Sequence, residues 1–134
     1  MRVIVTGQVG IDKKSYLESV AALGADLGHE IHLYHVGDRM YREAADVAAG
    51  RILDLPLSRL HSLRRSVFKD ILRESAGQEH VAVNTHATFR WRHGLFRAFD
   101  FDQIEQFEPD LFLCMVDNAE CCLLYTSDAA DECV

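Results

Sequence analysis

Short apolar segments recur along the chain at intervals that suit a layered fold. Val3 to Val5 form the first, and residues 30–36 form a second, which alternates and is rich in β-branched and aromatic side chains. A third short strand is predicted at residues 80–84. The near-continuous apolar run at residues 110–117 predicts a fourth, of the kind that is covered on both faces. We therefore expect four strands.

The intervals between these strands show helical spacing. Apolar residues at steps of three and four predict a helix that follows the first strand and ends near Gly28. A second helix is predicted to begin at an N-cap on Asp38 and to reach about Ala49. Strand, helix and strand in this order predict a parallel sheet with right-handed crossovers. The expected fold class is α/β, a three-layer parallel sheet with helices on both faces.

Two further helices are predicted in the second half of the chain. Ser58 is expected to cap the longer one, which ends at Gly77, and the shorter one spans Phe101 to Phe107 before Pro109. The apolar stripe of the longer helix consists of Leu60, Leu63, Val67, Phe68, Ile71 and Leu72. Its remaining faces carry Arg59, Arg64, Arg65, Lys69 and Arg73. A basic helical face is typically solvated, and the alternative is that one arginine reaches a phosphate.

Composition narrows the class of protein. A chain of 134 residues with 49% hydrophobic content suits one domain with a real core. The net charge of -7 argues against nucleic acid or an anionic membrane as a partner recognised through bulk charge. The start of the chain is unlike a secretory signal, so we expect a cytoplasmic protein. The 4 cysteines and 7 histidines lack metal-ligand spacing, which leaves a zinc site unsupported.

The loop after the first strand is the main candidate site. Counted from Gly7, the P-loop spacing G-x-x-x-x-G-K-[ST] puts Lys13 on the lysine, Asp12 on the second glycine and Lys14 on the hydroxyl residue. Two of the four fixed positions therefore differ from the motif. Ser15, the candidate Mg²⁺ ligand, lies one residue after the position that the motif gives to Ser or Thr. Amides of such a loop, backed by a helix dipole, form a cradle for phosphate. The alternative is that the glycines serve the turn alone.

A second group of candidates follows the other strands. Because the carboxyl ends of parallel strands meet at one edge of a sheet, we expect a loop at residues 85–92 that points into the same crevice. Its arginines, Arg90 and Arg92, would each donate paired hydrogen bonds to phosphate oxygens. His86 is a further candidate in this loop, and the alternative is that its ring is hydrogen-bonded to the backbone. The helix start at Asp38, with Arg39 or Arg42, is a further candidate for an anion.

Three landmarks carry a resemblance to a known family. They are the loop from Gly7 to Gly10, the helix entry Val36-Gly37-Asp38-x-Met40, and the segment Val83-Asn84-Thr85-His86-Ala87-Thr88. The last, where the family reads close to V-D-T-H-x-T, is the most specific. Over residues 1 to about 118 the chain resembles the P-loop nucleoside monophosphate kinases, most closely the archaeal-type adenylate kinases.

The resemblance implies a kinase that moves the terminal phosphoryl group of ATP, with Mg²⁺, to a nucleoside monophosphate. Lys13 and Arg90 would be the catalytic groups, acting mainly through charge and position. The phosphate-binding residues would be Gly7, Gln8, Val9, Gly10, Asp12, Lys13, Lys14 and Ser15. The monophosphate site would involve Gly37, Asp38, Arg42, Arg64, Thr85 and His86.

At two positions the sequence differs from the family in residues expected to take part in phosphate or Mg²⁺ binding. Asp12 replaces a glycine and brings a carboxylate beside the expected phosphates, a repulsion that Lys13 and Lys14 would offset. Asn84 replaces an aspartate near the Mg²⁺ shell. Two other functions therefore stay open. One is a regulatory module that binds nucleotide without transferring phosphate, and the other is an α/β domain without any nucleotide.

The end of the chain is expected to be foreign to the domain. Residues 122–134 resemble the in-frame translation of a sequencing-library adapter, and they are predicted to pack poorly. They hold 3 acidic and no basic residues, so the remainder carries -7 + 3 = -4. Residues 1–121 would then be the N-terminal part of a kinase-like domain, incomplete at its C-terminus, without the arginine-bearing lid and the last strand.

Overall fold

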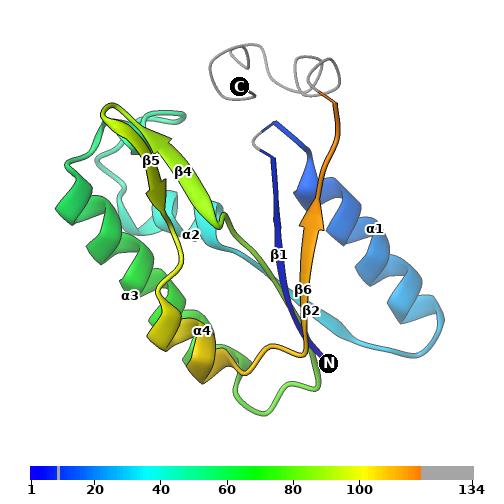
Figure 1. The fold of residues 1–134 in the computed structure, drawn as a ribbon. Coiled ribbons are helices and arrows are strands. Elements are labelled where there is room, and N and C mark those ends of the chain that lie inside the picture. The colour runs from blue at the N-terminus through cyan, green and yellow to red at the C-terminus, as the bar shows by residue number, and fades with distance from the viewer. Residues whose placement is uncertain (9, 119–134) are drawn as a thin grey trace.

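The computed structural model describes residues 1–8 and 10–118, and in this part of the chain four strands form one parallel sheet (Figure 1). The strands are β1 (Arg2–Gly7), β2 (Ile31–His35), β3 (His80–Asn84) and β6 (Leu111–Met115). Their order is β2-β3-β1-β6, and each neighbouring pair is parallel. All four predicted strands are confirmed, β3 with the predicted bounds.

Helices cover both faces of this sheet (Figure 1). The helix α1 (Lys13–Asp26) lies against one face, and α2 (Val36–Glu43), α3 (Leu57–Ser75) and α4 (Phe101–Phe107) lie on the other. A short 3-10 helix, η1 (Ile52–Asp54), precedes α3. The α/β fold expected from the sequence is therefore confirmed. So is the parallel arrangement that places the carboxyl ends of the strands at one edge.

The core follows from the two-residue period of the strands. Ile4 and Val83 are register partners, both fully buried, and they belong to the cluster under α3 and α4. The next residues along each strand face α1 instead. From α3, the predicted apolar stripe supplies Leu60, Val67, Phe68 and Ile71 to the same cluster, with Leu63 and Leu72 packed against it.

Arg2 ties the amino end of β1 to the helices beneath it. Its Nε donates to the carbonyl of Phe107 at 2.7 Å, and its Nη2 donates to Ser75 Oγ at 3.1 Å. The guanidinium carbon also lies 4.2 Å from the centre of the Phe107 ring. The ends of α3 and α4 are therefore held to the sheet at the edge opposite to the phosphate-loop candidate.

The starts of two helices differ from the prediction. Asp38 is not an N-cap, because α2 begins at Val36 directly after β2, and the helix ends at Glu43 rather than near Ala49. Val36 is only 1% exposed, so burial in the core draws the first turn of the helix forward. Ser58 is also not a cap, since Pro56 occupies that position and α3 begins one residue later.

The predicted loop at residues 85–92 is wrong in its second half. Thr88–Trp91 forms β4, which pairs antiparallel with β5, Gly94–Arg97. Phe89 is buried in the core, and Trp91 Nε1 donates to the carbonyl of Leu55 at 3.1 Å, so the hairpin is fixed to the segment before α3. The phosphate candidates beyond residue 87 therefore lie on a rigid hairpin.

The strand β6 is not covered on both faces as predicted. It is the last strand of the sheet order, and Phe112 remains 54% exposed. On the other face, α1 leans toward β2, where Gly24 allows close approach because a Cβ there would lie 2.6 Å from Ile31 Cδ1. An apolar hollow of about 390 Å³ consequently lies between α1 and β6.

Some predictions lie outside the described residues. These are the candidate Val9, the boundary at residue 121 and the tail at residues 122–134. Within residues 1–8 and 10–118, none of the helices combines the length and the apolar content that crossing a membrane requires.

We predict that Gly7→Ala destabilises the fold. A Cβ at Gly7 would lie 2.5 Å from the carbonyl oxygen of Met115, which is backbone and cannot move without opening the β1–β6 pairing. The expected loss is about 1–3 kcal/mol in the free energy of unfolding measured in urea. The matched control is Gly37→Ala in α2, where a Cβ meets nothing within 4 Å. An equal loss in both variants would contradict this assignment.

Candidate functional site

Lys13 is a buried cation at the amino end of α1. Its side chain reaches inward from the loop, is 5% exposed, and donates from Nζ to the carbonyl oxygen of Thr85 at 3.2 Å. Burial, together with the positive charge of Arg64, lowers the pKa of Lys13 to about 8. The lysine of the P-loop spacing is therefore held in the interior, where its charged form is less stable than in water.

Arg64 reaches the same place from α3. Its Nη2 donates to Thr85 Oγ1 at 2.8 Å, and burial lowers its pKa to about 10, so the guanidinium remains charged. Its Nε is buried without a hydrogen-bond partner. The helix pattern left Arg64 either solvated or reaching a phosphate, and the family resemblance placed it in the monophosphate site. Its position four residues after Leu60 and three before Val67, on the apolar stripe, was the available signal for the second alternative.

Thr85 is the point at which the two cations meet. It is 3% exposed, and its amide donates to the carbonyl of Val5 at 2.9 Å, which fixes it to β1. Neither Lys13 nor Arg64 forms an ion pair with any of the residues that the structure describes. Buried charges are ordinarily paired. A buried lysine and a partly buried arginine that share one neutral residue are therefore a candidate site for an anion.

His86 packs beside this cluster and contributes no charge to it. Its carbonyl oxygen accepts a long contact of 3.5 Å from Arg64 Nη2. Burial, and then the charges of Lys13 and Arg64, lower the pKa of His86 to about 4. The imidazole is therefore neutral at physiological pH.

The amides of the loop are used largely within the chain. Gln8 donates to the carbonyl of Met115 at 3.2 Å, Ile11 to Gln8 at 3.4 Å, and Lys13 to Ile11 at 2.9 Å. Gly10 has φ +94°, which suits glycine. The positive charge at this site is thus carried mainly by the two side-chain cations. The loop positions Lys13, and α3 positions Arg64.

Asp12 occupies the start of α1 with a negative charge of its own. Its Oδ1 accepts from the amide of Ser15 at 3.1 Å, and hydrogen bonds from Ser15 lower the pKa of Asp12. Lys14 turns to Asp38, at 2.8 Å, rather than to Asp12. That pair joins the loop to α2, although both side chains are about half exposed, at 51% and 52%.

Asn84 lies at the carboxyl end of β3 and contacts the neighbouring strand. Its Nδ2 is 3.0 Å from Nδ1 of His35, whose pKa burial lowers. The amide nitrogen is therefore engaged across the two strands, and the neutral residue at this family aspartate position has a structural partner.

The other candidates lie around this cluster. Gly37 is in the first turn of α2, and Arg42 is exposed in its last turn. Arg39 forms a bidentate pair with Glu74, at 2.8 and 2.6 Å, and is thus engaged away from the loop. Arg90 is exposed on β4, on the face opposite to Phe89.

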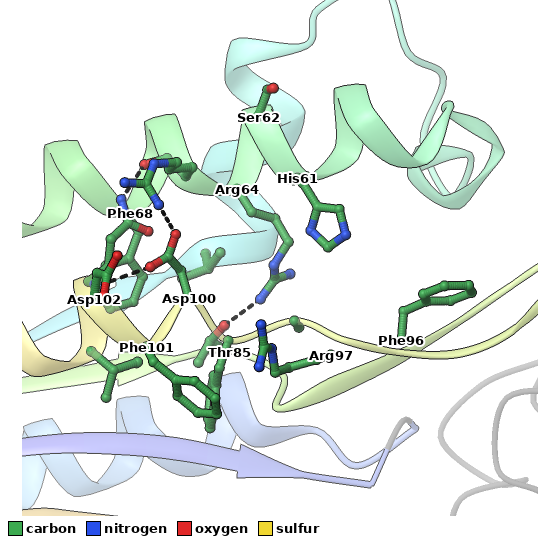
Figure 2. Close-up of a pocket in the computed structure, with 16 residues that line it drawn as sticks. His61, Ser62, Arg64, Phe68, Thr85, Phe96, Arg97, Asp100, Phe101 and Asp102 are labelled. Atoms are coloured by element: carbon green, nitrogen blue, oxygen red, sulfur yellow. Dashed lines mark hydrogen bonds and ion pairs between the residues drawn. The ribbon is translucent and has the colours of Figure 1, made fainter.

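A cavity of about 700 Å³ opens on the α3 side of Thr85 (Figure 2). Arg64 and Thr85 form part of its wall, and the segment from β5 to α4 forms another part. Its volume is in the range of small-molecule sites. The residues that the sequence analysis did not single out here are His61, Phe96, Arg97, Phe99, Asp100 and Asp102. No turn signal marks the hairpin that carries some of them, because its two-residue connection is Arg92-His93.

A family model described as an AAA domain matches residues 6–130 of the chain. The matched span includes the loop after β1, Lys13, Arg64 and Thr85.

We predict that Lys13→Met stabilises the folded chain at pH 7. Because the folded pKa of about 8 is below the unfolded value of about 10.4, protonated Lys13 costs stability below pH 8, by roughly 1–3 kcal/mol. That cost disappears as the pH rises from 8 toward 10.4. Urea unfolding across this range should show the variant ahead at pH 7 and the difference shrinking above pH 8. A variant that is less stable at pH 7 would contradict the assigned burial.

Proposed function

The chain belongs to the AAA domain family, and from that premise we propose that it binds ATP and transfers its terminal phosphoryl group to a nucleoside monophosphate. Membership supports a P-loop nucleotide-binding protein. The observation that carries the proposal further is the meeting of buried Lys13 and partly buried Arg64 at Thr85. Polyphosphate is the common small molecule whose charge matches two such cations.

The residues at the amino end of α1 fit the phosphates of ATP. Lys13 supplies a protonated donor, and its pKa would rise when an anion binds beside it. The start of the α1 dipole lies at the same place. Lys14, about half exposed, can exchange its contact with Asp38 for a phosphate oxygen at small cost, since exposed pairs contribute little.

Oxygen donors for Mg²⁺ are present at the same position. Asp12, kept ionised by Ser15, and the Ser15 hydroxyl are the kind of ligands that Mg²⁺ takes. The ion would neutralise charge on the transferred group. In this proposal Asp12 serves the cation instead of repelling the phosphates.

The cavity beside Thr85 suits the acceptor. Arg64 lines it and also contacts Thr85, whose carbonyl holds Lys13, so the two subsites share one residue. Transfer would break the bond between the terminal phosphorus and ADP and form one to an oxygen of the monophosphate, yielding a diphosphate. Arg90 and Arg42 would neutralise charge at the rim, and His86 would serve as a neutral contact.

Two observations favour the alternative of a binding module without transfer. The Asp12 carboxylate already caps α1, and Asn84 contributes no negative charge next to the proposed Mg²⁺ site. Catalysis by such sites depends on positioning and electrostatics. Turnover separates the alternatives, because both require ATP to bind.

We predict that ATP with Mg²⁺ binds to the chain and that Lys13→Ala weakens this binding by about a hundredfold, as expected when a charged donor to phosphate is removed. Isothermal titration measures the affinity. Lys69→Ala, an exposed lysine on α3, is the matched control and should bind ATP like the unchanged chain.

Release of ADP with AMP present is the second readout. Formation of ADP from ATP and AMP supports the kinase, whereas ATP binding without ADP formation supports the regulatory module. No binding of ATP to the unchanged chain would overturn both.

A further inference from the structure

We propose that Arg97 and Arg64 together form a clamp for the phosphate of a phosphomonoester in the cavity beside Thr85. This inference rests on the proposed function, because it specifies how the acceptor site recognises its ligand.

The two guanidinium groups enter the cavity from different elements. Arg64 extends from α3 and Arg97 from the end of β5, and both reach toward the part of the cavity near Thr85 (Figure 2). Arg64 is partly buried, and its buried Nε has no hydrogen-bond partner among the residues that the structure describes. Arg97 is exposed at the mouth. An anion between them would be held from the inside by one and from the solvent side by the other.

Arg97 is held by an aromatic ring rather than by a carboxylate. Its guanidinium carbon lies 4.5 Å from the centre of the Phe101 ring, and it forms no ion pair with the residues described. A guanidinium stacked on an aromatic face keeps its edge donors available and loses less freedom when it binds. The side chain is thus oriented without having its charge neutralised.

The third arginine of the cavity is already neutralised. Arg65 forms an ion pair with Asp100, which also caps α4 by accepting from the amide of Gln103 at 3.2 Å. Asp100 and Asp102 lie toward the α4 end of the cavity, away from the ends of Arg64 and Arg97 (Figure 2). Positive charge is therefore concentrated near Thr85, where the proposed transfer takes place.

Two guanidinium groups match a phosphomonoester better than they match a neutral ligand. Each can donate two parallel hydrogen bonds to a pair of phosphate oxygens. The aromatic lining from Phe96 and Phe101 offers a surface for a flat organic group attached to that phosphate. A nucleoside monophosphate has both parts, and adenosine has only the second.

The test compares AMP with adenosine on the Arg97→Ala variant of the full chain by isothermal titration. Arg97 is exposed, so its removal leaves the core intact. We expect AMP to bind about tenfold more weakly to the variant, while adenosine binds to both proteins equally. Arg73→Ala, an exposed α3 arginine paired with Asp70, is the control and should leave AMP binding unchanged.

Three results would overturn the clamp. These are equal affinity of the variant and the unchanged chain for AMP, equal weakening of AMP and adenosine, and absence of AMP binding to the unchanged chain. The outcome is separable from that of the proposed function. ADP formation with unchanged AMP affinity in Arg97→Ala removes the clamp alone, and weakened AMP affinity without ADP formation supports the clamp and removes the transfer.

Discussion

The proposed site depends on a buried lysine and a partly buried arginine that share a single neutral residue. Lys13 comes from the loop after β1, Arg64 comes from α3, and Thr85 accepts from both through different oxygens. The arrangement is costly to fold, as the lowered pKa values of both groups indicate. Chains tolerate such a cost where the charge has a use.

The sheet explains why these residues meet. Parallel strands bring the ends of β1 and β3 to one edge, and the amide of Thr85 continues the pairing of β3 with β1. The long helix α3 crosses the face beneath, so one position on its apolar stripe, Arg64, comes up beside the strand end. The far edge is held by Arg2. The sheet thereby holds the charged groups at fixed positions, which is what a site that works by positioning its ligand requires.

The sequence predicted the elements better than it predicted the site. The bounds of β3 and α4 could be predicted from apolar spacing and, for the end of α4, from Pro109, because those signals are local. The hairpin was missed because its turn has no Asn-Gly signal. The exposure of β6 was missed because the sequence of a single strand does not determine the order of strands in the sheet. Lys13 could be predicted from loop spacing. Arg64 was assigned to the monophosphate site only through the family resemblance, because the partial burial of its side chain depends on packing between distant segments.

The most direct test of this account is the pKa of the Lys13 amino group, measured by NMR titration of the labelled side chain with and without pyrophosphate. The account predicts a pKa of about 8 for the chain alone and a rise of at least about one unit with pyrophosphate, because an anion beside Lys13 favours its charged form. An ordinary lysine pKa that pyrophosphate leaves unchanged would contradict it. Lys13 would then be solvated, and the charged edge would not be a phosphate site.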